Sequence, residues 1–253
     1  PNLQNLHMGF QFCDQISEVG VAGFASGFGS MLRVLDLTFQ SCPSVNDSVL
    51  AALADKLPVG LEILRINFRF CEKVTDAGLK SLGSRIPSGL KELELIFGGE
   101  RKICEITDDG FLAMIATLPT EKLSMAWGCN NHITDRSLIE LGKRSPSTLK
   151  EFSIDMYFVS CISDRGVEGL IKGLPPNLQN LNVSFGGSRS YITDASAESI
   201  SKYLPVKLRS ANISLTYSSV SERGVVAFAN NIPATLESFK MCTWGSEVHR
   251  GFD

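Results

Sequence analysis

One sequence pattern recurs nine times along this chain of 253 residues, at intervals of 28 to 30 residues. The pattern is L-x-x-L-x-L-x-F with substitutions, as in LRVLDLTF from Leu32 and LKELELIF from Leu90. Apolar residues at its fourth, sixth and eighth places alternate with polar ones, which is the period of a strand that buries one face. The nine copies begin at Leu3, Leu32, Leu61, Leu90, Thr120, Leu149, Leu178, Leu208 and Leu236. A chain that repeats one short unit at a fixed period folds by stacking those units.

The second half of each complete repeat carries a helix signal. In the third repeat, Thr75 can accept a free backbone N–H as a helix N-cap, and Asp76 follows in the first turn, where the helix dipole favours negative charge. Apolar residues then recur at helical spacing, and Pro87 ends the helix because proline cannot continue it. The predicted N-caps of the eight complete repeats are Ser17, Asn46, Thr75, Thr107, Thr134, Ser163, Thr193 and Ser221.

This order of strand, turn, helix and return resembles the leucine-rich repeat family, from Leu3 to about Trp244. The V/I-T-D-x-G-L element is similar to the cysteine-containing type of F-box proteins, and the repeat length is nearer the ribonuclease-inhibitor type. The resemblance implies an α/β leucine-rich repeat solenoid, curved, with a parallel sheet on the concave face and helices on the convex face. We expect a single domain, 1–253, of eight full repeats plus a ninth strand. We also expect it to be a fragment of a longer protein, because neither end shows the capping repeat with a polar outer face that a solenoid needs.

Composition excludes several classes of function. The formal net charge is -3, without the basic stripe of a nucleic-acid binder, and no apolar run approaches the length of a membrane span. The seven cysteines are odd in number and form no CxxC pair, so they predict neither a disulfide framework nor a zinc site. A reducing compartment fits this usage, and the Asn-led turn of extracellular leucine-rich repeats is missing. We therefore expect an intracellular, cytoplasmic protein.

Two sets of residues invite a catalytic or metal interpretation. Cys13, Cys42 and Cys71 recur 29 residues apart, and we expect them to be small buried side chains of the turn rather than metal or redox ligands. The three histidines fall in distant repeats, and the sequence contains no phosphate-binding loop, nucleophile elbow or paired-acid motif. The sequence predicts no enzyme, no cofactor and no metal.

The concave face is the default binding surface of this architecture, and its side chains should come from the third, fifth, seventh and ninth places of each repeat. The candidate partner-binding residues there are Asp36, Ile63, Arg65, Arg69, Glu92, Glu94, Lys122, Glu151, Asp155, Tyr157 and Trp244. A merely solvated sheet face is the alternative, and both interpretations stay open. Among aromatic residues just past the strands, we expect Phe12, Phe70 and Phe158 to fill the turn core, and Tyr157 and Trp244 to be exposed.

Two repeats carry extra residues between strand and helix. GGERKICEI follows Phe97 and GGSRSYI follows Phe185, and both segments begin with Gly-Gly and contain arginine. Insertions in solenoids map to loops on one face, which is often the binding face. The further candidate contacts are Arg101, Lys102, Arg189 and Tyr191.

The segment PNLQNL occurs at residues 1–6 and again at residues 176–181. Because it covers the return turn and first half of a strand, its leucines Leu3, Leu6, Leu178 and Leu181 should point into the core.

These features favour a non-enzymatic scaffold for protein–protein interaction, which binds its partner through the concave face and the strand-end loops. One alternative is the substrate-recognition part of an F-box-type ubiquitin ligase. Another is a structural subunit of a large cytoskeletal, ciliary or other assembly. In each case the expected partner is a protein, with no nucleic acid and no membrane span, and its identity does not follow from the sequence.

Overall fold

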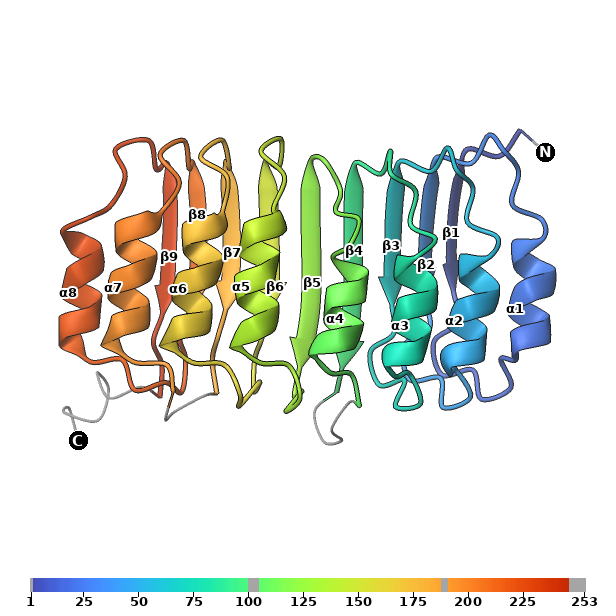
Figure 1. Cartoon of the computed structure of the whole chain (residues 1–253), viewed down its shortest axis with the longest axis horizontal. Helices are drawn as coiled ribbons and strands as arrows, with labels where there is room; N and C mark the ends of the chain where they lie inside the picture. Colours follow the sequence, from blue (N-terminus) through green and yellow to red (C-terminus); the bar gives the residue numbers. More distant parts are fainter. Residues whose placement is uncertain (1, 100–104, 188–190, 246–253) are drawn as a thin grey trace. The chain divides into compact units, whose positions relative to one another are not determined.

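The computed structural model of the chain describes residues 2–99, 105–187 and 191–245 (Figure 1). The chain divides into two compact units, an N-terminal unit of residues 1–126 and a C-terminal unit of residues 127–253. The described residues form nine strands and eight helices that alternate along the sequence. The predicted α/β leucine-rich repeat fold is therefore confirmed, whereas the single domain stays a prediction.

The bounds of the elements follow the repeat. The N-terminal unit contains β1 (Asn5–Gly9), α1 (Glu18–Ala25), β2 (Val34–Thr38), α2 (Asp47–Ala54), β3 (Ile63–Asn67), α3 (Asp76–Gly83), β4 (Glu92–Gly98) and α4 (Asp108–Met114). Strand β5 (Lys122–Gly128) includes the boundary between the units. The C-terminal unit contains α5 (Asp135–Arg144), β6 (Glu151–Asp155), α6 (Asp164–Gly173), β7 (Asn180–Ser184), α7 (Asp194–Tyr203), β8 (Ser210–Ser214), α8 (Glu222–Ala229) and β9 (Ser238–Cys242).

Within each unit, consecutive strands pair in parallel and in sequence order, and the helices cover one face of the sheet (Figure 1). The register joins equivalent places of neighbouring repeats, so that Leu35 lies beside Leu64 and Leu64 beside Leu93. A shift by one residue would turn every buried leucine to solvent, so the apolar pattern holds this register. The sheet face away from the helices is called the open face below.

The eighth place of each repeat builds an aromatic stack behind the sheet of the N-terminal unit. The rings of Phe10, Phe39, Phe68 and Phe97 stack in order, with centroids 5.2, 5.5 and 5.4 Å apart. Phe39 and Phe68 are fully buried. Stacked rings at such distances contribute about 0.5–1.5 kcal/mol per pair beyond the area they bury.

All eight predicted N-caps are confirmed. Each cap residue has an extended backbone, and its side-chain oxygen accepts a hydrogen bond from a backbone N–H of the first helical turn. The prolines also lie beyond the helix ends as predicted. Except at Pro119, the proline carbonyl accepts the N–H of the leucine that begins the next repeat, as from Leu61 to Pro58 at 3.1 Å and from Leu178 to Pro175 at 3.1 Å.

The aspartate after the cap has a second role in several repeats that the pattern did not predict. The carboxylate of Asp47 accepts both the backbone N–H (2.8 Å) and the hydroxyl (2.7 Å) of Thr75, which is the cap of the next repeat. Acids that make this double contact are called the cross-repeat carboxylates below, and among the described residues they include these pairs: Asp47 to Thr75, Asp76 to Thr107, Asp135 to Ser163, Asp164 to Thr193 and Asp194 to Ser221. They join the start of one helix to the start of the next.

The cross-repeat carboxylates explain the glycine of the T-D-x-G element. A Cβ at Gly78 would lie 2.5 Å from Oδ1 of Asp47, and one at Gly224 would lie 2.6 Å from Oδ1 of Asp194. Such contacts are too short for any Cβ unless the carboxylate shifts, so glycine fits this place best. Ser196 occupies the same place in its repeat, and its hydroxyl instead donates to Asp164.

The two copies of PNLQNL differ in burial. Leu178 and Leu181 are buried as predicted, at 0% and 2% exposure. The prediction is wrong for Leu3, which is 47% exposed, because β1 is the first strand of its unit and pairs only with β2 among the described residues.

Candidate functional site

The open face carries the side chains at the third, fifth and seventh places of the repeats, as predicted. On β2, β3 and β6 these residues are half-buried while the residues between them are buried. A sheet face with no helix on it keeps its side chains accessible, and here they are mostly charged or hydroxyl- and amide-bearing.

In the N-terminal unit the open face carries a row of paired charges. Arg65 donates to Glu92 at 2.9 Å and lies 3.9 Å from Glu94, with all three side chains about one-third exposed. Asp36 lies beside Arg65 in the strand register and 3.3 Å from the ring of His7. Four predicted contacts, Asp36, Arg65, Glu92 and Glu94, therefore lie side by side on β2, β3 and β4. The fifth, Ile63, is half-buried at the start of β3.

A second ionic contact lies just before these strands. Lys91 donates to Glu62 at 2.6 Å, and Arg33 lies 3.9 Å from the same carboxylate. The hydrogen bond from Lys91 holds the pKa of Glu62 below its usual range and raises the pKa of Lys91. Both side chains are well exposed, so this pair orders the surface more than it stabilises the fold.

In the C-terminal unit the open face is richer in neutral polar groups. The Asn182 amide donates to the hydroxyl of Ser153 at 3.1 Å, and the Asn212 amide donates to the Asn182 carbonyl at 3.0 Å. These three residues, called the amide row below, cross β6, β7 and β8. Glu151 and Asp155 are half-buried on β6 at either side of Ser153. Lys122, another predicted contact, is half-buried at the start of β5.

The strand-end turns hold aromatic residues in an unusual backbone conformation. Phe12, Phe70, Phe158 and Tyr217 occupy the tenth place of their repeats with φ between 54° and 65°. This left-handed region costs a residue with a Cβ about 1–2 kcal/mol. Three of the rings lie against a glycine at the same place in the next repeat: Phe70 on Gly99, Phe158 on Gly187 and Tyr217 on Gly245.

The exposure of these aromatic residues departs in part from the prediction. Phe12 is 72% and Phe158 46% exposed, so the expectation that they fill the turn core is wrong. Phe70, the third residue of this expectation, is half-buried although it has the same left-handed conformation, so the conformation alone does not set the exposure of the ring. Trp244 is exposed as predicted, at 63%, whereas Tyr157 is half-buried.

Four of the aromatic residues gather at the ends of strands in the C-terminal unit. Tyr157 meets Phe158 with ring centroids 4.4 Å apart, and Tyr217 meets Trp244 at 4.9 Å, both edge to face. These four are called the aromatic cluster below. Burial, together with the neighbouring Tyr217 phenol, raises the pKa of Tyr157. Asp155 adjoins the cluster, since it accepts the backbone N–H of Tyr157 at 3.0 Å.

The remaining predicted contacts are on strand-end segments. The guanidinium of Arg69 lies over the ring of Phe70, 5.1 Å from its centroid. Tyr191 is 56% exposed, and its carbonyl accepts the backbone N–H of Asp164. Arg101, Lys102 and Arg189 lie outside the described residues.

The prediction of a buried cysteine column holds for Cys42 and Cys71 and is wrong for Cys13, which is exposed in the first repeat. Cys42 and Cys71 are buried, and their thiols donate to the backbone carbonyls of Phe10 (2.7 Å) and Phe39 (3.0 Å) in the preceding repeats. Burial raises the pKa of the Cys42 thiol. Within the described ranges no three His, Cys, Asp or Glu side chains gather closely enough to hold a metal ion. Nor does any helix there combine the length and apolar character needed to cross a membrane.

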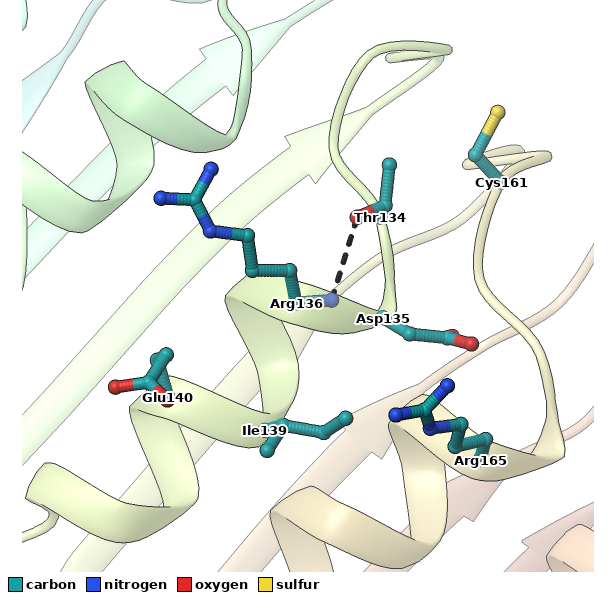
Figure 2. Close-up of a pocket in the computed structure, with 7 residues that line it drawn as sticks. All are labelled: Thr134, Asp135, Arg136, Ile139, Glu140, Cys161 and Arg165. Carbon is teal, nitrogen blue, oxygen red and sulfur yellow. Dashed lines mark hydrogen bonds between the residues drawn. The ribbon is translucent and has the colours of Figure 1, made fainter.

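A hollow of about 440 Å³ lies on the helical side of the C-terminal unit, where no binding residue was predicted (Figure 2). Its lining comes from the first two turns of α5, the first turn of α6 and the loops before them: Thr134, Asp135, Arg136, Ile139, Glu140, Cys161 and Arg165. Asp135 is a cross-repeat carboxylate held by Ser163, and Glu140 pairs with Lys143 at 2.8 Å. Arg136 extends away from Arg165 in Figure 2. These side chains serve the contact between helices and do not converge on one point.

Sequence reasoning missed the amide row as a unit and the gathering of the aromatic cluster. Ser153, Asn182 and Asn212 share the fifth place of successive repeats, so their common place in the period was the signal for the row. Tyr217 meets Trp244 across neighbouring repeats at adjacent places, a contact that the one-dimensional pattern does not show.

Comparisons with known proteins returned structures alone. No protein-family model and no curated protein matches the chain. Among solved structures, the chain is similar to a chain of the crystal structure of the Rad7 and Elc1 complex in yeast, at 15% identity and a TM-score of 0.40, covering 85% of this chain and 68% of that one. It is also similar to the leucine-rich repeat-containing protein LegL7 from Legionella pneumophila, at 11% identity and a TM-score of 0.45, covering 99% of this chain and 87% of that one.

Proposed function

We propose that this protein is a non-enzymatic scaffold that binds a partner protein through the open face and the adjoining strand-end turns. The observation that carries the proposal is the open face itself. It presents half-buried, mutually ordered side chains along successive strands, with the Arg65 charge row in the N-terminal unit and the amide row in the C-terminal unit. Side chains already held in one geometry lose less entropy when a partner binds.

The kind of partner follows from the mixed character of this face. Charges of both signs, amides and exposed aromatic rings are the composition of a protein-binding surface, in which a few aromatic and arginine residues supply most of the affinity. A phosphate backbone would favour a uniform row of Lys and Arg instead.

The proposal includes an intracellular location. The six described cysteines are free thiols, and two of them donate hydrogen bonds inside the fold. Oxidation of these thiols would remove those donors, so a reducing compartment suits the fold.

A charge exchange tests the proposed surface. In the double variant Arg65→Glu with Glu94→Arg, positions 65 and 94 keep opposite charges, residue 65 now meets Glu92 and Asp36 with like charge, and the polarity that a partner meets is reversed. The matched control exchanges the helical ion pair of Glu168 and Lys172, which lie 2.6 Å apart. Both proteins are used as bait in quantitative affinity capture from cells.

Proteins captured by the wild type and by the helical control should fall at least tenfold in abundance with the open-face variant. Equal capture by all three baits would show that the open face is not the binding surface. Unfolding curves recorded on each bait confirm that the exchange has not disrupted the fold.

A further inference from the structure

The amide row gives the C-terminal unit a means of contacting a peptide backbone. Each asparagine amide has two N–H donors and a carbonyl with two lone pairs. Within the row, Asn182 uses one donor toward Ser153 and one lone pair toward Asn212. The capacity that remains on this exposed side chain matches a backbone peptide group, which offers one N–H and one carbonyl. The internal hydrogen bonds fix the amide planes in one orientation.

Beside the row, the aromatic cluster and Asp155 suit a cationic side chain. Ring faces attract Lys and Arg side chains, and a nearby carboxylate adds to that attraction. The charged residues at the open-face places of β6, β7 and β8 are both acidic, Glu151 and Asp155. The ring of Tyr157 lies against Gly186, and that of Phe158 against Gly187, so both rings are held in place by backbone.

The N-terminal unit shows the same contact made within the chain. There, Phe70 occupies the place of Phe158, and the guanidinium of Arg69 lies over its ring. Asn67 accepts the backbone N–H of Arg69 at 2.9 Å, just as Asp155 accepts that of Tyr157 at 3.0 Å. The C-terminal unit therefore replaces an arginine by a second ring and a neutral amide by a carboxylate. Both changes favour a cation supplied by another molecule.

We propose that the open face of the C-terminal unit binds an extended, lysine- or arginine-containing segment of a partner protein. The amide row contacts the backbone of this segment, and the aromatic cluster with Asp155 receives a cationic side chain. This inference rests on the proposed function and names the chemistry of its partner.

The dimensions of the surface fit such a segment. Four parallel strands spaced about 4.8 Å apart extend over roughly 14 Å, a distance that about five residues of extended chain cover. Lys240 follows Asn212 in the register and places a positive charge on β9. The cations of the segment should therefore lie over β6 and β7 rather than over β9.

The experiment titrates the full chain with two peptides, Ac-(Lys-Gly)4-NH2 and Ac-(Gln-Gly)4-NH2, at low ionic strength. Binding is followed by the fluorescence of the exposed Trp244 and by calorimetry. The lysine peptide should bind at least tenfold more tightly than the glutamine peptide. Tyr157→Leu should weaken the lysine peptide about threefold, as expected for loss of an exposed cation–π contact.

Asp155→Asn is the sharpest variant, because an asparagine can still accept the Tyr157 N–H, as Asn67 does for Arg69. It should weaken the lysine peptide about threefold or more and leave the glutamine peptide unchanged. Glu168→Gln on α6 makes the same change of charge on the helical side and should have no effect. Equal binding of the two peptides, or equal losses in Asp155→Asn and Glu168→Gln, would overturn the inference.

The two proposals can fail separately. If the lysine peptide binds no better than the glutamine peptide while the Arg65 and Glu94 exchange still abolishes capture, the inference falls and the proposed function stands. If the peptide results are as expected but capture is insensitive to the exchange, a basic segment binds the C-terminal unit and the charge row of the N-terminal unit is not part of the interface.

Discussion

The cross-repeat carboxylates make a strong prediction about stability, and Asp164 is the best position at which to test it. Its carboxylate accepts four hydrogen bonds from α7 and its cap: the Thr193 N–H (2.9 Å), the Thr193 hydroxyl (2.6 Å), the Ser196 N–H (3.1 Å) and the Ser196 hydroxyl. Asp164→Ala would leave all four donors without this acceptor, and two of them are backbone groups.

The magnitude follows from the burial of the site. A hydrogen bond to a charged group contributes about 1.5–3 kcal/mol, but Asp164 is half-buried, so water can replace part of what is lost. We expect Asp164→Ala to lower the free energy of unfolding by about 2–4 kcal/mol. Asp164→Asn keeps one oxygen acceptor and should lower it by about 1–2 kcal/mol.

Glu222 provides the matched control. It occupies the same place at the start of α8, it is exposed, and no later helix follows within the described residues. Glu222→Ala removes the favourable interaction with the helix dipole alone, which contributes about 0.3–1 kcal/mol. Each variant is unfolded in urea and followed by circular dichroism, while hydrogen exchange reports local opening at residues 193–203.

The free-energy difference between the two alanine variants isolates the cross-repeat contact. With a urea slope of about 2 kcal/mol/M, a loss of about 3 kcal/mol moves the midpoint by roughly 1.5 M. Exchange at the start of α7 should rise in Asp164→Ala and not in Glu222→Ala. Equal destabilisation by the two substitutions would refute the assignment of Asp164 as a contact between repeats.

Three further predictions concern packing, thiols and charge. Gly173→Ala should lower the free energy of unfolding by about 1–3 kcal/mol, because its Cβ would lie 2.5 Å from the Gly142 carbonyl oxygen. Gly23→Ala, which has open space around it in α1, should instead raise the free energy of unfolding by about 0.5–1 kcal/mol. Thermal unfolding of both variants measures this contrast. Iodoacetamide should label the exposed Cys13 and Cys161 in the folded protein but Cys42 only on unfolding, because Cys42 is buried and its raised pKa lowers its thiolate fraction. The labelling rates are measured by mass spectrometry of timed samples. A Cys42 that reacted as fast as Cys13 would contradict this prediction. Lys91→Met should raise the pKa of Glu62 toward its ordinary value in a carbon-detected NMR titration. Because the pKa of Glu62 is lower in the folded than in the unfolded state, the pair stabilises the fold at pH values above the unfolded-state pKa, and this stabilisation is lost as pH falls through the folded-state pKa. A Glu62 titration that is unchanged in the variant would rule out this pairing.

Much of the fold followed from the period alone. A repeat of 28 to 30 residues places equivalent residues of neighbouring strands side by side, so the register, the buried leucines and the eight caps could all be predicted. The role of the cross-repeat carboxylates could not, because a one-dimensional pattern places an acid at a helix start without showing which neighbour its side chain reaches. The T-D-x-G spacing held a signal, since Gly78 is required by Asp47 of the preceding repeat.

The sequence predicted which residues line the open face, but it predicted less well how their side chains are arranged. Alternation identified the open-face residues, and Arg65 and Glu94 indeed lie side by side. The exposure of Phe12 and Phe158 was mispredicted because the repeat pattern places an aromatic residue in the turn without showing how much of its ring the neighbouring repeat covers. Burial of Leu3 failed for a different reason, since the pattern does not distinguish an outer strand from an inner one.

The most direct test of the central claim is site-specific photocrosslinking in cells. A benzophenone amino acid is placed on the open face at Thr38 of β2 and at Ser214 of β8, and on the helical side at the exposed Ser48 of α2 and Ala195 of α7. The proposed function predicts that partner proteins crosslink to Thr38 or Ser214 and not to Ser48 or Ala195. Crosslinks from the helical positions alone, or equally from both faces, would contradict it.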